Sequence, residues 1–489
     1  MPTLETTNGG ARSFRARHLA IFLGGVLLVS ACASSGDAST SDAVVDDSSV
    51  SVAGVESNRT PPYLYPVAPD SPTAADQSPE LAVEAVDRLS LGFEIGILDF
   101  GAVTLLAENG DARHAWYVSD MMRFFGSGEG DVLVNAFEQL TGVSIADDPA
   151  SERSSWLSVT NHLIAWDTPD YPNYREDKSG IFLLVEPEWE PFFSDADSAI
   201  DWRYISWGGV LIDDRELGDT QGCANGCIPA LDDPAVTDSA GGDWYPDDAL
   251  VFGLLEGEDA LAIPKNIAEV HEMFNLTLGD RRLGVPYCTL CGSAQAYYTD
   301  NTGAAEQPVL RTTGLLSRSN KVMYDLRTSS VFDTFTGAAI SGPLQDLDLE
   351  LEQTTIVVST WGEWKQQHPD TSIIAEDGGI GRSYSLDPLA GRDDDGPIFA
   401  VGSVDDRLGT QEVVVGVITD DDVAVAFPSG QASATVADGG DVTLAGVTLL
   451  ADGDGLRAVD ADTGDSLVSH ESFWFAWSQF HPDTQLWSA

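Results

Sequence analysis

Two cysteines of this chain stand at a spacing shared by redox, metal-binding and structural sites. Cys288 and Cys291 enclose Thr289 and Leu290 as a C-x-x-C pair. Such a pair can close a small disulfide, with one thiol activated as a thiolate and the other resolving it. It can equally supply two thiolates to a metal ion, or form an inert structural disulfide. The spacing alone leaves all three interpretations open.

Basic residues gather around the pair. Six of the chain's 24 lysines and arginines lie between residues 281 and 327, namely Arg281, Arg282, Arg311, Arg318, Lys321 and Arg327. Cations near a thiol lower its pKa and favour the thiolate, although in an acidic chain they also neutralise carboxylates. The redox interpretation makes Cys288 the more exposed nucleophile, Cys291 the resolving thiol and Arg318 a tuning group.

His271 precedes Cys288 by 17 residues, in a segment expected to be helical. Together with Glu272 it begins like the His-Glu-x-x-His zinc motif, but Asn275 stands where the second histidine is required, which excludes a zincin. His271 remains a candidate tuning base for a cysteine. It is also a candidate third ligand, with the two cysteines, of a copper or zinc ion, or a hydrogen-bonded core residue.

A second cysteine pair, Cys223 and Cys227, has three residues between its members. Four thiolates in two pairs could build a zinc site, but zinc ribbons separate their pairs by roughly 15–20 residues. Here 60 residues intervene. The sequence therefore predicts a Cys223–Cys227 disulfide.

The N-terminus carries the pattern of a lipoprotein signal peptide. Basic residues precede an apolar run at 19–29, which is shorter than the ~20 residues of a membrane span. The run leads into Val-Ser-Ala-Cys ending at Cys32, the form of a bacterial lipobox. The pattern predicts cleavage before Cys32, lipid on its sulfur and anchoring on the extracytoplasmic side of the cell membrane. The four remaining cysteines would then lie where disulfides persist.

Charge narrows the choice of partners. The 489 residues include 24 lysines and arginines against 79 aspartates and glutamates, a formal net charge of -55. Such a surface repels nucleic acid, so no nucleic-acid partner is expected. We interpret the acidity as solvation in a salty medium, because the acids are spread along the chain. The hydrophobic fraction of 43 % is that of a globular protein.

Composition divides the chain into five parts. Residues 1–31 form the predicted signal peptide and 32–79 a disordered tether. A mainly helical region is predicted over 80–175. A β-rich core with the Cys288/Cys291 pair follows over 176–400, and a shorter β-rich part over 401–489.

The fold class predicted from the apolar patterns is α+β with a β-rich core. Helical periodicity marks four N-terminal segments, at 81–89, 117–125, 132–140 and 156–166. From residue 181 onward, short apolar runs between Gly, Asp and Pro are typical of strands, beginning with the run 181–187. Short helices are predicted at 265–274 and 361–367. Helices are expected to cover a largely antiparallel sheet or sandwich.

The β-rich part contains an internal repeat. The segment 249–264 recurs as 412–428, a strand, an acidic turn and a strand ending in Pro. The segment 361–371 recurs as 474–484, with Trp-x-x-Trp-x-x-x-His-Pro-Asp-Thr in both copies. Repetition at this level predicts two related structural units.

The two predicted lobes span about 229–375 and 405–489. The second copy lacks the helix with His271 and the C-x-x-C pair, so we expect features of the first copy alone to form the site. His368 and His481 occur in both copies and are therefore predicted to be structural. The chain has no G-x-S-x-G, Walker A or haem-attachment motif. Thiol–disulfide oxidoreductase is the candidate enzyme class, with an unidentified redox partner.

Several segments resemble the DUF3179 family, a bacterial and archaeal family of unknown function. They include PYCTLCGSAQAY at 286–297, WYPDDALVFG at 244–253 and GLLSRSNKVMYD at 314–325. The resemblance covers roughly 200–375. Some members of the family carry selenocysteine at the C-x-x-C position. The resemblance therefore implies a redox role for Cys288 and Cys291, whereas Cys223 and Cys227 have no counterpart in the general family pattern.

Overall fold

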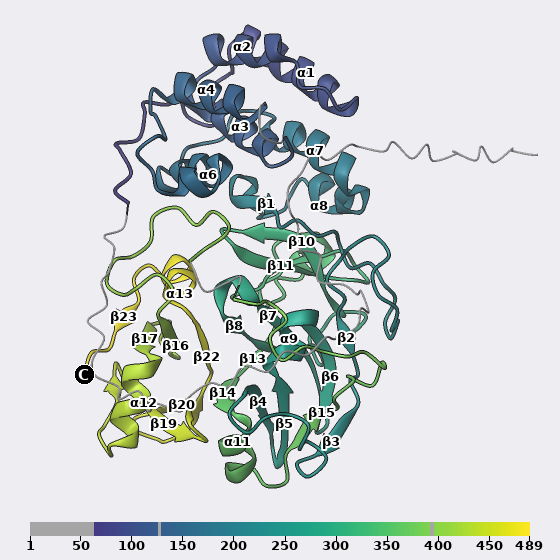
Figure 1. Cartoon of the computed structure of the whole chain (residues 1–489), viewed down its shortest axis with the longest axis vertical. Coiled ribbons are helices and arrows are strands. Elements are labelled where there is room, and N and C mark those ends of the chain that lie inside the picture. The colour runs from purple at the N-terminus through teal and green to yellow at the C-terminus, as the bar shows by residue number, and fades with distance from the viewer. Residues whose placement is uncertain (1–62, 126–128, 392–395) are drawn as a thin grey trace, which may run out of the picture.

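The computed structural model describes residues 63–125, 129–391 and 396–489 (Figure 1). Cys32 and the predicted signal peptide lie outside the described residues. None of the described helices is long and apolar enough to cross a membrane. The end of the predicted tether is packed against the fold, since Trp166 Nε1 donates to Pro66 O at 2.8 Å.

The N-terminal part is helical and forms a layer at one end of the molecule (Figure 1). Its helices and 3-10 turns are α1 (Glu80–Glu94), α2 (Phe100–Asn109), η1 (Ala112–His114), α3 (Ala115–Met122), α4 (Glu129–Thr141), α5 (Ala150–Arg153), α6 (Ser155–Ala165), α7 (Tyr174–Val185), η2 (Pro187–Trp189), α8 (Glu190–Ser194) and η3 (Trp202–Tyr204). Asp99 and Ser154 cap α2 and α6 by accepting backbone N–H bonds. Helices thus continue beyond the predicted boundary at 175.

The run 181–187 was predicted to be a strand, but residues 181–185 form the end of α7, and η2 begins at Pro187. Ile181 and Phe182 are buried with Tyr174 and Lys178, at the spacing of one helix face. A short apolar run does not by itself distinguish a buried helix segment from a strand. The run is helical here because the polar residues that precede it belong to the same helix and make that helix longer.

Small sheets in a propeller-like ring form the β-rich core (Figure 1). The first sheet has the order β1 (Ile205–Trp207), β10 (Leu310–Ser317), β11 (Asn320–Asp325), β12 (Val331–Asp333). The second has the order β13 (Gln353–Thr354), β9 (Ala296–Tyr298), β7 (Arg281–Cys288), β6 (Met273–Leu278), β2 (Leu231–Asp232), with β8 (Ser293–Ala294) paired to β7. The expected mixed α+β class with N-terminal helices is confirmed, but a single sheet or sandwich is wrong.

Two further sheets share an order of connections. One is β14 (Val357–Thr360), β4 (Leu250–Glu256), β5 (Asp259–Pro264), β15 (Ser372–Ile374), β3 (Val236–Asp238). The other is β22 (Ser469–Phe473), β16 (Val413–Ile418), β17 (Ala424–Pro428), β23 (Gln485–Leu486). In each, an antiparallel hairpin is flanked by one antiparallel and one parallel strand. The last sheet is β18 (Thr443–Leu444), β19 (Val447–Asp452), β20 (Gly455–Asp460), β21 (Ser466–Leu467).

Short helices cover these sheets: α9 (Lys265–His271), α10 (Gly342–Gln345), α11 (Trp361–Gln367), α12 (Ser429–Ala437) and α13 (Trp474–Phe480). The helix predicted at 265–274 ends at His271, because Glu272 adopts a left-handed conformation with φ 53°. α11 lies over β4 and α13 over β16. Gly253 and Gly416 admit the indole rings above them, since an added Cβ would lie 2.3 Å from Trp364 or 2.1 Å from Trp477.

Candidate functional site

The C-x-x-C pair forms a tight turn at the end of a strand. Cys288 is the last residue of β7, and the 3-10 turn η4 (Thr289–Cys291) leads to Gly292, whose φ is 57°. β8 then returns antiparallel to β7, with Cys288 opposite Ser293. A Cβ on Gly292 would lie 2.9 Å from the ring of Phe473. Only glycine satisfies both the backbone conformation and the close approach.

A second hairpin turn meets the first. Arg318 and Ser319 join β10 to β11 as a two-residue loop with φ angles of 49° and 72°. Positive φ at both positions is the geometry that hairpins usually give to Asn and Gly. The turn presents the carbonyl of Ser319 to both sulfurs, 3.8 Å from Cys288 Sγ and 3.6 Å from Cys291 Sγ. Cys291 Sγ also lies 3.5 Å from Asn320 Oδ1.

A buried ion pair lies beside the thiols. Lys321 Nζ is 2.7 Å from Glu272 Oε2, and the two side chains are only 5 % and 9 % exposed. The ammonium group also donates to the carbonyls of Glu272 and Tyr287, both at 2.6 Å. Thr289 donates to the other carboxylate oxygen of Glu272 at 3.1 Å. The carboxylate of Glu272 and the two backbone carbonyls therefore hold the ammonium group of Lys321 in place next to the C-x-x-C turn.

The surroundings make the two thiols unequal. Burial acts to raise the pKa of Cys288, but a hydrogen bond from Cys291 and the charge and backbone N–H of Lys321 outweigh it, so this pKa is lowered. Burial and the interaction with Cys288 raise the pKa of Cys291. Cys288 is thus the thiol that ionises first, and Cys291 holds its proton as the donor.

Both thiols are enclosed by the protein. Cys288 and Cys291 are free and are 1 % and 0 % exposed. They belong to an apolar cluster with Phe335 and with residues of β16, β17 and α13, including Trp474 and Trp477. The expectation that Cys288 is an exposed nucleophile is therefore wrong. The C-terminal strands and helix, which lie against this turn, shield the pair from solvent (Figure 1).

Arg318 lies in the turn that touches the pair, but its charge faces elsewhere. Its guanidinium lies 4.0 Å from the centre of the Tyr204 ring. The tuning cation beside the thiols is Lys321. Side chains alternate in direction along a hairpin, so neighbouring basic residues of the sequence do not share one environment. The sequence placed Lys321 in the basic cluster without distinguishing it.

Both ring nitrogens of His271 form hydrogen bonds to groups other than the thiols. Its Nδ1 lies 2.7 Å from Pro229 O and its Nε2 lies 2.8 Å from the hydroxyl of Tyr384. Burial is the main cause that lowers the pKa of His271 to about 4. Within the described residues, His271 joins no compact group of potential metal ligands with Cys288 and Cys291. The expected three-ligand metal site is not formed.

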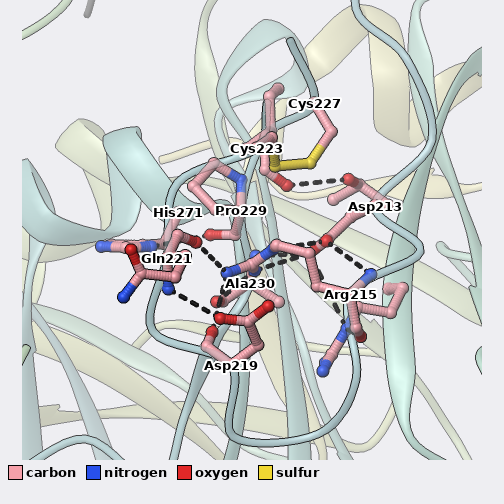
Figure 2. Close-up of a disulfide and its surroundings, with 12 residues drawn as sticks. Asp213, Arg215, Asp219, Gln221, Cys223, Cys227, Pro229, Ala230 and His271 are labelled. Atoms are coloured by element: carbon pink, nitrogen blue, oxygen red, sulfur yellow. Dashed lines mark hydrogen bonds and ion pairs between the residues drawn. A yellow bond between two sulfur atoms is a disulfide. The ribbon is translucent and has the colours of Figure 1, made fainter. Parts of the chain in front are cut away.

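The other cysteine pair is a disulfide between Cys223 and Cys227 in a largely exposed loop (Figure 2). A carboxylate oxygen of Asp213 lies within 4.8 Å of both sulfurs. That carboxylate is already engaged, with Arg215 Nε at 2.7 Å and the backbone N–H of Ala230 at 2.8 Å. The oxidised pair has no thiolate that could bind a metal ion. The loop therefore has the properties of a structural disulfide or of a disulfide that a partner can reach.

Sequence reasoning missed three groups that complete the site: Glu272, Thr289 and Asn320. Glu272 was considered only as part of an incomplete zinc motif. The available signal was the pair of strand-like runs joined at Arg318 and Ser319, which implies a hairpin and hence a defined position for the residues just after it.

Comparison with known proteins adds a family but no activity. Residues 225–460 match the family model described as a protein of unknown function, DUF3179. No curated protein matches the chain, and no solved structure matches it. The matched segment contains Cys288, Cys291 and the Glu272–Lys321 ion pair, whereas the Cys223–Cys227 pair lies across its first residue.

Proposed function

We propose that this chain, which belongs to the DUF3179 family, binds a soft metal ion between Cys288 and Cys291. The observation that carries the proposal is the burial of two thiols in one tight turn, against the same carbonyl of Ser319. A partner protein's thiolate must reach a sulfur to exchange with it, and burial opposes that approach. A single ion needs far less space, and two thiolates are ligands that soft cations prefer.

Cu(I) suits this pair better than zinc. Structural zinc is almost always held by four ligands. Within the described residues, the only compact group of three potential ligands is Asp213 with the disulfide cysteines, so no third histidine, cysteine or carboxylate joins Cys288 and Cys291. Cu(I) is stable with two thiolates as its only protein ligands. The apolar cluster around the pair would also keep water and oxidants from the ion.

Charge balance gives Lys321 a role in binding. Binding of Cu(I) to two thiols releases two protons and leaves a bis-thiolate complex with a charge of minus one. The ammonium of Lys321 and its backbone N–H already lower the pKa of Cys288. Because protons compete with the metal for the sulfurs, affinity should rise with pH.

Titration with Cu(I) in the absence of oxygen, against a chromogenic Cu(I) chelator, tests the proposal. The purified protein should bind one ion per chain. Cys288→Ser and Cys291→Ser should each lose it. The double variant Cys223→Ser/Cys227→Ser is the matched control, because it removes the same number of sulfurs from the other pair and should keep full binding.

No bound copper in the wild-type protein, or equal loss in the control variant, would contradict the proposal. Mass spectrometry on the same samples would show whether Cys288 and Cys291 are reduced. A disulfide between them in freshly prepared protein would favour the second candidate function.

That second candidate is thiol–disulfide exchange, favoured by the unequal thiols. A lowered pKa at Cys288 and a raised one at Cys291 match a nucleophile and a resolving thiol. Closing the disulfide removes two electrons and two protons, which a disulfide-bearing oxidant would accept. The reduction potential of the Cys288/Cys291 pair tests this candidate, because a value below about −300 mV would indicate an inert structural disulfide. Exchange would also require the covering C-terminal elements to open.

The cellular location belongs to the same proposal. The lipobox ending at Cys32 supports lipid anchoring on the extracytoplasmic face, where disulfides such as Cys223–Cys227 persist. In cell fractionation the protein should sediment with membranes. The Cys32→Ser variant should lose its lipid mass and leave the membrane fraction, and no change between the two would contradict anchoring.

We also infer that the repeat reflects two related lobes. Support comes from the shared strand order of the sheets containing β4–β5 and β16–β17, each covered by a Trp-bearing helix over a glycine. Trp364 donates to Thr371 at 3.0 Å and Trp477 to Thr484 at 2.9 Å, seven residues on in both cases. The His368 and His481 rings follow the same pattern, tilted against Trp364 and Trp477 with ring centroids 4.2 and 4.3 Å apart.

A further inference from the structure

A cavity of about 130 Å³ lies beside the disulfide loop, away from the thiol turn. Its walls come from the loop segment 218–222, from 229–232 at the start of β2, from His271 of α9 and from the turn 380–382. Figure 2 shows Gln221, Pro229 and His271 on one side of the Arg215 side chain, with the disulfide nearby. Residues from the loop before β2, from α9 and from the turn 380–382 therefore converge on one small space.

Arg215 holds the wall in place. Its guanidinium binds both carboxylate oxygens of Asp213, at 2.7 and 2.9 Å, and donates to the backbone carbonyls of Asp219, Gln221 and Ala230 at 2.8–2.9 Å. These bonds use all five of its N–H donors. Arg215 thus shapes the loop and adds charge, while a ligand's hydrogen bonds must come from elsewhere.

Arg382 brings a second guanidinium to the cavity. Arg382 is one of the residues that line the space, and its charge helps to keep the pKa of the neighbouring His271 low, after the larger effect of burial. Two arginines on one small cavity stand out in a chain with 79 acidic and 24 basic residues. Guanidinium groups recognise carboxylates through charge-assisted hydrogen bonds.

The acidic residues of the wall weaken this attraction less than their number suggests. Asp232 is bound by Arg311 at 2.9 and 2.7 Å, by the side chain of Asn275 at 2.9 Å and by Gly218 N–H at 2.9 Å. Asp219 is exposed and accepts from the backbone of Gln221. A dianion would still meet two carboxylates, so a monoanion fits better.

The remaining lining favours an organic body. Leu231 and Ile380 present apolar side chains, and Pro229 adds a ring. His271 keeps both nitrogens in hydrogen bonds and stays neutral near pH 7, because its pKa is about 4. The cavity thus joins one cationic side to an apolar side, in a volume that holds only a few non-hydrogen atoms.

We propose that this cavity binds a short-chain monocarboxylate, with the carboxylate against Arg382 and the hydrocarbon chain against Leu231 and Ile380. The site is separate from the thiol pair and does not depend on the metal proposal. The disulfide loop forms one wall, so closure of Cys223–Cys227 should favour binding by ordering that wall.

Calorimetric titration of the full-length protein with sodium butyrate tests the proposal, with butyramide and inorganic phosphate at equal ionic strength as comparison ligands. Butyrate should bind, and butyramide, which has the same shape without the charge, should bind about tenfold more weakly or not at all. Equal binding of butyrate and butyramide, or tighter binding of phosphate, would overturn the proposal.

Variants locate the site. Arg382→Gln should weaken butyrate binding about tenfold, and Arg382→Lys should restore part of it. Arg327→Gln is the matched control, because this arginine forms an exposed ion pair with Glu306 at 3.1 Å and lies outside the cavity lining. Thermal unfolding of each variant confirms folding. Unchanged affinity in a folded Arg382→Gln protein, or equal loss in the control, would contradict the assignment.

Discussion

Substitution of Lys321 by Met tests the central structural claim, that the thiol turn rests on a desolvated ion pair. The substitution preserves much of the side-chain volume and removes the ammonium. Glu272 would then keep a carboxylate that is 9 % exposed, with only the hydroxyl of Thr289 and no cation. The backbone carbonyls of Glu272 and Tyr287 would also lose the ammonium donor, although that of Glu272 keeps the N–H of Tyr287 at 2.9 Å. Removing one partner of a buried pair costs about 3–5 kcal/mol, and we expect a loss in that range.

Urea unfolding at pH 7 measures this loss, and a double-mutant cycle assigns it. Lys321→Met/Glu272→Gln removes the stranded charge and should recover about 1–3 kcal/mol relative to Lys321→Met alone. Lys365→Met is the matched control. Its partner Asp247 is 72 % exposed, so that pair should contribute less than about 1 kcal/mol.

The same variant has a second readout at the thiols. The charge of Lys321 helps to lower the pKa of Cys288, so its removal should raise that pKa and weaken Cu(I) binding at pH 7. The reasoning is refuted if Lys321→Met unfolds as easily as the Lys365→Met control, or if the cycle shows no coupling. Unchanged Cu(I) affinity in a destabilised variant would separate a structural role from an electrostatic one.

Three further predictions concern other parts of the fold. Gly292→Ala should destabilise the protein by about 1–3 kcal/mol in urea unfolding, because the backbone at position 292 has a positive φ and lies close to the Phe473 ring. Gly257→Ala is the control and should cost about 1 kcal/mol, because Gly257 has a φ of 59° but open space around it. Burial lowers the pKa of His470 to about 3, below its unfolded value near 6.5, so this histidine contributes stability at neutral pH that is lost as pH falls from about 6.5 to 3. His470→Gln should flatten the stability–pH curve over that window by one proton, and an unchanged slope would contradict the assignment. Cys223→Ser/Cys227→Ser should lower the free energy of unfolding by about 2 kcal/mol, as expected for a disulfide that closes a short loop. The same variant should bind butyrate more weakly. Unchanged melting and unchanged affinity would show that the disulfide does not order the cavity wall.

Elements were predictable where the local pattern and its stop signal agree. The helix expected at 361–367 matches α11, because two tryptophans at helical spacing precede the His368–Pro369 stop. β4 and β5 were also predictable, since two apolar runs flank a short acidic turn. The run 181–187 failed because its apolar residues fit a helix face equally well. The ring of small sheets could not be predicted, since it depends on which strands pair across the chain.

The site was predictable in position but not in environment. The C-x-x-C spacing located Cys288 and Cys291, yet their burial is due to a cluster with residues of β16 and α13, more than 120 residues later. The ion pair with Glu272 joins residues 49 apart, through a left-handed turn after α9. Such contacts arise from tertiary packing, and no local pattern in one sequence encodes them.

The C-x-x-C turn, which is absent from the second copy of the sequence repeat, packs against residues of that second copy. The turn's Gly292 abuts Phe473 of β22, and the thiols share their cluster with Trp474 and Trp477 of α13. The C-terminal part therefore covers the C-x-x-C turn, and the contacts between them limit the access of solvent to the sulfurs. Any reaction of the thiols, with an ion or with an oxidant, must proceed through that interface or through its opening.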